Sequence, residues 1–191
     1  MGEASAKAQK LQTPVTSGIK FSHSDQVIYI IVNFFENCNN GSVIGYLKMG
    51  WKNLFIFDMS GSYIKKRCFC CLDFYIHDSK QRQGFGKKLF DFMLRDNKIT
   101  ANLIPIDRPS EKLLMFLKKH YNLCTIIPQS NNFILYQQFF YGKNDNNETK
   151  ENDTKSSLCG KNISHSVNEK SCEPSITIKK YIQEQWLKNA I

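Results

Sequence analysis

The fold of this chain is decided by one stretch, residues 70–88, which reads CCLDFYIHDSKQRQGFGKK. Its first eight residues are almost wholly apolar and predict a buried strand. Gly84 and Gly86 then predict a tight loop that opens a helix. A strand–loop–helix junction of this kind directs backbone N–H groups and the positive end of the helix dipole at one spot. We therefore expect a binding site for an anionic, phosphate-bearing ligand at this junction.

The size and charge of the chain limit the classes of partner. With 191 residues, 41% hydrophobic and 13% aromatic, the sequence is typical of one globular domain with a full core. Residues 1–141 hold 18 Lys and Arg against 10 Asp and Glu, so most of the net charge of +9 lies there. A basic folded part indicates an acidic partner, which could be a polyphosphate ligand, a nucleic acid or an acidic protein surface.

The cysteines and the N-terminus indicate a reducing, intracellular compartment. The seven cysteines are irregularly spaced and form no disulfide framework or metal-binding pattern. The N-terminus has no apolar signal core, and no run of apolar residues approaches the length of a membrane span. We expect no metal and no membrane association.

Hydrophobic periodicity predicts the other elements. Helices are expected over residues 3–12, after Gly86 and from Pro109 onward. Strands are expected over residues 26–35, 42–49, 53–59, 68–77, 102–106 and 132–140.

The C-terminal part of the chain has a different composition. Residues 142–175 are rich in Asn, Asp, Glu, Lys and Ser, and we expect this low-complexity segment to be disordered. Residues 176–191 place Ile178, Ile182, Trp186 and Leu187 at loosely helical spacing, which predicts a short amphipathic helix. The expected organisation is therefore a domain over 1–141, a disordered segment over 142–175 and a terminal helix over 176–191.

Three side chains need an interpretation, and for Asp107 the residues leave a structural and a chemical one open. Asp107 comes just before a proline-started helix and could cap that helix, or it could act as a general base. Cys70 is by default a small buried hydrophobe, and Gln9 a solvent-facing residue on a Lys-rich helix.

The glycine loop is similar to that of a known superfamily. The pattern Gln81-x-x-Gly84-x-Gly86 matches the pyrophosphate loop of acetyl-CoA-dependent N-acetyltransferases, the GNAT superfamily. Rossmann and Walker loops fit less well, because their glycine spacing differs and no Gly-Lys-Ser/Thr is present.

Several longer segments resemble the alpha-tubulin N-acetyltransferase family. They are CCLDFYIH at 70–77, IDRPS at 106–110, KHYNL at 119–123, NNF at 131–133, ASAKAQ at 4–9 and the region 45–52. The resemblance covers residues 3–140 and implies an α/β fold, a GNAT-like mixed and mostly antiparallel sheet flanked by helices. It also implies transfer of an acetyl group from acetyl-CoA to a lysine in the lumenal loop of α-tubulin, on microtubules in the cytoplasm.

The resemblance further implies the functional residues. The catalytic positions would be Asp107, Cys70 and Gln9, and the positions facing tubulin would be Lys48, Lys52 and Arg108. The acetyl-CoA contacts would fall on Phe74, Tyr75, Ile76, His77, Asp78, Ser79, Lys80, Gln81, Arg82, Gln83, Gly84, Phe85, Gly86, Lys87, Ser110, Glu111, Lys112, Leu113, Leu114, Met115, Phe116, Leu117, Lys118 and Lys119.

The chain departs from the family at its start. The family's first strand and the beginning of its first helix have no counterpart before Glu3, so we expect one edge of the sheet to be uncovered.

These residues predict direct acetyl transfer, with Asp107 accepting the lysine proton through water, Cys70 lining the site and Gln9 positioning a loop or the substrate. Two alternatives stay open, a lysine acetyltransferase for another protein and a catalytically impaired microtubule-binding module. Nucleic-acid binding is disfavoured, because no recognised motif accompanies the basic residues.

Overall fold

Among the residues that the structure describes, seven strands form the central sheet. They are β1 (Val27–Asn33), β2 (Ser42–Phe57), β3 (Tyr63–Ile76), β4 (Ile106–Asp107), β5 (Ile126–Pro128), β6 (Phe133–Tyr136) and β7 (Ile176–Ile182). The sheet order is β5-β6-β4-β3-β2-β1-β7, and of its pairings only β3–β4 is parallel. The structure is a computed structural model that describes residues 1–37, 40–141 and 176–182.

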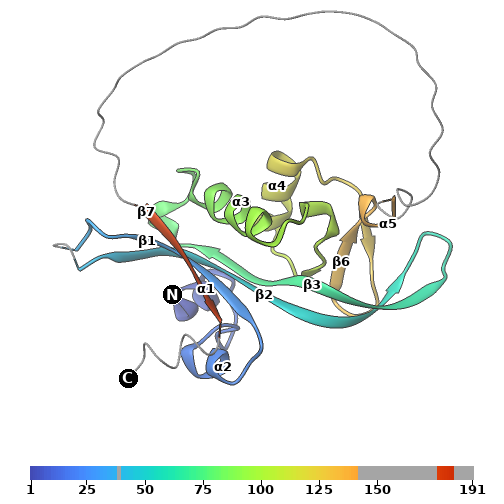
Figure 1. Cartoon of the computed structure of the whole chain (residues 1–191), viewed down its shortest axis with the longest axis horizontal. Helices are drawn as coiled ribbons and strands as arrows, with labels where there is room; N and C mark the ends of the chain where they lie inside the picture. Colours follow the sequence, from blue (N-terminus) through green and yellow to red (C-terminus); the bar gives the residue numbers. More distant parts are fainter. Residues whose placement is uncertain (38–39, 142–175, 183–191) are drawn as a thin grey trace, which may run out of the picture.

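Helices cover both faces of this sheet. The helices are α1 (Gly2–Ala8), α2 (Gly18–Ser22), α3 (Phe85–Asn97), α4 (Glu111–Tyr121) and α5 (Gln138–Tyr141), with 3₁₀ turns η1 (Asp78–Lys80) and η2 (Ala101–Leu103). Figure 1 shows α3 and α4 on one face and α1 and α2 on the other. The expected fold, a mixed and mostly antiparallel sheet flanked by helices, is therefore confirmed. No helix among the described residues is long and apolar enough to cross a membrane.

The main core lies between the sheet and α3. Leu89, Phe90 and Met93 project from one side of α3 and are fully buried. They belong to one cluster with strand residues such as Leu47 and Ile106. Apolar residues at helical spacing on α3 therefore pack against apolar residues at two-residue spacing on the strands, as the sequence predicts.

The long β2–β3 hairpin replaces two of the predicted strands. Residues 42–49 and 53–59 were expected to be separate, but β2 runs without a break from Ser42 to Phe57. A register shift after Lys48 accommodates one extra residue on β3, so the pairing continues to the turn. Figure 1 shows the hairpin extending beyond the helices.

Three other expectations are wrong in detail. The strand predicted over 102–106 is η2 followed by the two-residue strand β4, and the strand predicted over 132–140 is β6 followed by α5. Residues 176–182 form β7 instead of a helix, because their β-branched side chains fit the ladder beside β1. Because β7 pairs with β1, the edge of the sheet that we expect to be open is covered. Residues 142–175 and 183–191 lie outside the described residues.

The close pairing of β2 and β3 gives a test of the fold. A Cβ atom at Gly45 would lie 2.6 Å from the carbonyl oxygen of Tyr75 and closer still to Ile76 Cδ1. Gly45→Ala should therefore lower the free energy of unfolding by about 1–3 kcal/mol, since the β3 backbone must move. Urea denaturation measures the change. Val43→Ala on the same strand is the control, because Val43 is 42% exposed. Equal stability of Gly45→Ala and wild type would contradict the pairing.

Candidate active site

The parallel strands β3 and β4 separate soon after they meet. They share one residue pair, Cys71 with Ile106, and the Cys71 N–H donates to the Pro105 carbonyl at 2.9 Å. Beyond it β3 continues to Ile76, whereas β4 ends at Asp107. Ligands of α/β sheets bind outside the carboxyl ends of such diverging strands. We call residues 70–77 and 106–110 the β3–β4 junction.

The start of α3, which lies next to the end of β3, provides backbone N–H donors that no side chain caps. Gly84 is the N-cap residue with φ +82°, and no side chain caps the helix. A Cβ at Gly86 would lie 3.4 Å from Phe74 and 3.6 Å from Phe116, which are ordinary van der Waals contacts, so the first turn of α3 packs on these two rings without requiring glycine there. Free N–H groups and the helix dipole favour a phosphate, and Arg82 and Lys87 add exposed positive charge, although the Lys87 ammonium also donates to Asp91 Oδ2 at 2.5 Å.

The loop between β3 and α3 is held by its own side chains. Gln81 Nε2 donates to the Ile76 carbonyl at 2.9 Å and to Asp78 Oδ1 at 2.7 Å. His77 Nδ1 lies 2.9 Å from Ser79 Oγ, and Lys80 forms an ion pair with Glu36. These side chains therefore shape the loop, and Lys80 is already paired.

The residues of α4 that we expect to contact acetyl-CoA lie in two environments. Leu117 is fully buried and Phe116 packs on Phe74, with ring centroids 5.5 Å apart, so both belong to the core. Lys118 and Lys119 are exposed and can add positive charge.

Asp107 is not the cap of α4. Ser110 is the N-cap residue, and its Oγ accepts from the Leu113 N–H at 3.3 Å. The capping interpretation of Asp107 is therefore wrong, because α4 begins three residues later than that role requires. The carboxylate lies 3.8 Å from Arg108 Nε and its side chain is 31% exposed.

The surroundings of Asp107 make it a better base. Burial raises the pKa of the Asp107 carboxyl above its usual range, while the positive charges of Arg108, Lys52 and Lys48 oppose that rise. A carboxylate of raised pKa accepts a proton more readily at neutral pH.

Cys70 has the properties of an unreactive thiol. It is fully buried, and its Sγ–H donates to the Cys68 carbonyl at 3.4 Å. Burial raises the pKa of the Cys70 thiol to about 12. The group is therefore protonated at neutral pH, unlike the thiolate that a nucleophilic cysteine requires.

A buried carboxylate fastens the segment that precedes α2. Asp73 Oδ2 accepts from Thr16 Oγ1 at 2.5 Å and from the Tyr46 hydroxyl at 2.7 Å. Next to it, the Lys48 ammonium donates to the Val15 carbonyl at 3.0 Å. The sequence gives Asp73 as the one charged residue of an apolar strand, a signal that a buried partner must exist, but it does not identify that partner.

The expected substrate-facing residues differ in exposure. Arg108 is exposed and Lys52 is half-buried, and the charge of Lys52 influences Asp107. Lys48 is only 5% exposed, and burial lowers the pKa of its ammonium. In this conformation Lys48 holds the chain at Val15 instead of presenting its charge to a protein. Gln9 is exposed, and its amide donates to Ser5 Oγ at 2.8 Å.

The described residues contain no group of three or more His, Cys, Asp or Glu side chains that could hold a metal ion.

The strand β3, the glycine loop and the helix α3 follow one another as in the class of GNAT acetyltransferases. Residues 1–168 match the sequence profile described as GNAT acetyltransferase, Mec-17, and the chain belongs to this family. The resemblance to alpha-tubulin N-acetyltransferases is confirmed by curated relatives of that name. The chain is 49% identical over 146 residues to the one from Anopheles gambiae, 48% over 143 to the one from Aedes aegypti and 46% over 159 to the one from Schistosoma japonicum.

These alignments include 76%, 75% and 77% of this chain but only 30%, 52% and 57% of the relatives' own lengths. Among solved structures, the KacTA–DNA complex gives a TM-score of 0.43 at 15% identity over 64% of this chain and 76% of that chain, too distant to inform its function.

The Asp73 contacts predict the effect of removing that carboxylate. Asp73→Ala leaves the hydroxyls of Thr16 and Tyr46 without their acceptor, so the free energy of unfolding should fall by about 2–4 kcal/mol. The segment around Thr16 should also loosen, and trypsin should cut faster after Lys10. Asp58→Ala in the exposed hairpin turn is the matched control and should leave cleavage after Lys10 unchanged. Unaltered proteolysis of Asp73→Ala would show that the carboxylate does not fasten this segment.

Proposed function

We propose that this chain transfers the acetyl group of acetyl-CoA to the side-chain amine of a lysine in the lumenal loop of α-tubulin, acting on microtubules in the cytoplasm. The observation that carries the proposal is Asp107 itself, a half-buried carboxylate of raised pKa at the end of β4, the strand that pairs with β3 ahead of the glycine loop. Membership of the Mec-17 family and the names of the curated relatives support it.

The donor would be held at the β3–β4 junction. Backbone N–H groups at the start of α3, with Arg82 and Lys87, would bind the diphosphate of acetyl-CoA, and Lys118 and Lys119 would add charge. The fit is supported by the missing side-chain cap at the start of α3. The thioester of acetyl-CoA supplies the activated acetyl group.

Asp107 would accept the proton that the acceptor lysine must lose. A lysine ammonium has a pKa of about 10.4 in solution, so at neutral pH it needs a base before it can attack a carbonyl carbon. The raised pKa of Asp107 suits it for that role, directly or through a water molecule.

Cys70 would line the site without bonding to the acetyl group. Its thiol stays protonated at neutral pH, which favours direct transfer between donor and acceptor over an acyl-cysteine route. Lys48 and Asp73 would act indirectly, by holding the segment from Gln9 to Thr16 against the sheet.

The test is acetylation of assembled tubulin by the purified chain with acetyl-CoA, read by mass spectrometry. Unrelated acidic proteins serve as alternative acceptors. Modification of the α-tubulin lumenal lysine alone supports the proposal, whereas equal modification of the other proteins would show a different acceptor. Absence of any acetyl transfer would leave a microtubule-binding role.

Removal of the Asp107 charge should abolish most of the activity. Asp107→Asn keeps the shape of the side chain but cannot accept the proton, so kcat should fall by about two to four powers of ten. The KM for acetyl-CoA should change little, because Asp107 does not belong to the phosphate-binding loop. Asp25→Asn, at an exposed position before β1, is the matched control. Full turnover of Asp107→Asn on tubulin would exclude the base role.

The pH profile tests the charges around Asp107. The Lys52 ammonium lowers the pKa of Asp107, so Lys52→Met should raise that pKa. Because only the ionised carboxylate can accept a proton, the acidic limb of the kcat/KM profile should move to higher pH. Lys65→Met, farther along the same hairpin, should leave the limb in place. A shift to lower pH, or equal shifts in both variants, would contradict the assignment of that limb to Asp107.

A further inference from the structure

Strand β7 completes the sheet although it lies beyond the family match. Residues 1–168 match the Mec-17 profile, whereas β7 begins at Ile176. All seven of its residues pair antiparallel with β1, from Val27 opposite Ile182 to Asn33 opposite Ile176. Figure 1 shows β7 beside β1 at the outer edge of the sheet. This edge would otherwise present unpaired backbone groups.

The side chains of β7 extend both layers of the core. Ile176 and Ile178 pack against the cluster that includes α3. Tyr181 packs against the separate cluster formed by Phe21, Ile28, Tyr46 and Tyr75. Strand β7 therefore fits both faces of the sheet and pairs with β1 along its whole length. These properties make it a specific occupant of this edge.

The same strand is tied to α3. Asp96 Oδ2, near the end of α3, accepts from Lys180 Nζ of β7 at 2.7 Å and from the Tyr29 hydroxyl of β1 at 2.7 Å. Asn97 Nδ2 donates to the same Tyr29 oxygen at 2.8 Å. One carboxylate therefore links the helix to both outer strands.

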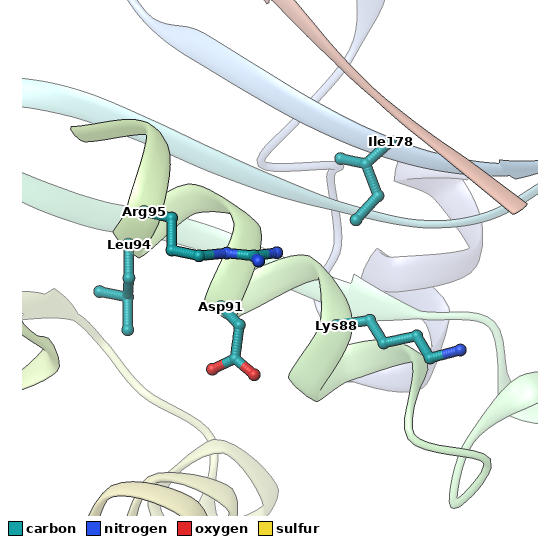
Figure 2. Close-up of a pocket in the computed structure, with 5 residues that line it drawn as sticks. All are labelled: Lys88, Asp91, Leu94, Arg95 and Ile178. Atoms are coloured by element: carbon teal, nitrogen blue, oxygen red, sulfur yellow. The ribbon is translucent and has the colours of Figure 1, made fainter. Parts of the chain in front are cut away.

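A groove between α3 and β7 continues this contact along the helix. Figure 2 shows Ile178 projecting from β7 toward α3; the other lining residues, Lys88, Asp91, Leu94 and Arg95, all belong to the helix. Helix α3 begins at the glycine loop. Strand β7 therefore contacts the same helix whose first turn would bind the donor phosphates.

We propose that β7 is a tethered edge strand whose docking on β1 holds α3 in place and so increases the affinity of the acetyl-CoA site. This coupling to acetyl-CoA rests on the proposed function, whereas the docking itself does not. The occupant is the chain's own segment, because Ile176, Ile178 and Tyr181 match the two faces and Lys180 lies opposite Asp96.

The main experiment measures amide hydrogen exchange and acetyl-CoA binding of the full chain. Ile178→Asp places a charge against α3 and should undock β7. Exchange in β1 should then accelerate, and the Kd for acetyl-CoA should rise roughly tenfold, within the usual range of coupling between sites. Ile182→Asp is the matched control, since Ile182 is 38% exposed at the end of the same strand, and it should change both quantities little.

A milder pair of variants separates docking from misfolding. Lys180→Met removes the contact with Asp96, and Lys179→Met removes a lysine that does not reach Asp96. Only Lys180→Met should raise the KM for acetyl-CoA, by roughly twofold to fivefold as expected for a partly exposed ion pair, with kcat unchanged. Fast β1 exchange with unchanged acetyl-CoA affinity would overturn the coupling. If wild type binds no acetyl-CoA, the proposed function and the coupling both fail, and β1 exchange alone decides the docking.

A disulfide test decides which copy supplies the strand. Val32 and Thr177 are directly opposite in the ladder, so cysteines at both positions come within bridging distance. Val32→Cys with Thr177→Cys should form a link within one chain, identified by mass spectrometry of the joined peptides. Val27→Cys with Thr177→Cys is the control, because those positions lie at opposite ends of the ladder. A link between two chains would mean that a second copy supplies the strand, and absence of any link would overturn the docking.

Discussion

The separation of β3 from β4 is the constraint on which the rest of the structure depends. Strand β3 pairs with β2 over most of its length but with β4 at Cys71 alone. Its carboxyl end therefore lies unpaired by β4 beside the start of α3. Had β4 continued past Asp107 in register, the backbone groups of both strands would be used in the sheet. The short strand thus accounts for a carboxylate that stays partly accessible at the end of β4.

The polar groups inside the sheet have an organising role. Asp73 and Lys48 are both nearly buried, and each reaches across to a segment that has little regular structure of its own. Buried charges of this kind are costly unless they are satisfied, so they specify one arrangement of that segment. At the β1 edge of the sheet the partly exposed carboxylate of Asp96 joins a helix to two strands.

Local sequence signals predicted part of this structure. The strand, glycine loop and helix around Gly84 follow from periodicity and turn chemistry, which act over a few residues. The surroundings of Asp107 and Lys48 did not follow, because they depend on which residue caps α4 and on a distant chain segment. Strand β7 was expected to be a helix, since Ile178 and Ile182 fit a helical spacing and only the presence of β1 selects the extended form. Pairing between residues far apart in sequence is the information that periodicity lacks.

The protonated state of Cys70 has a consequence for inhibitor chemistry. Electrophilic compounds react with thiolates, and this buried sulfur carries its hydrogen at every physiological pH. A covalent warhead aimed at Cys70 would therefore find no thiolate to react with. Among the described cysteines only Cys124 is exposed, so it is the thiol that such compounds can reach.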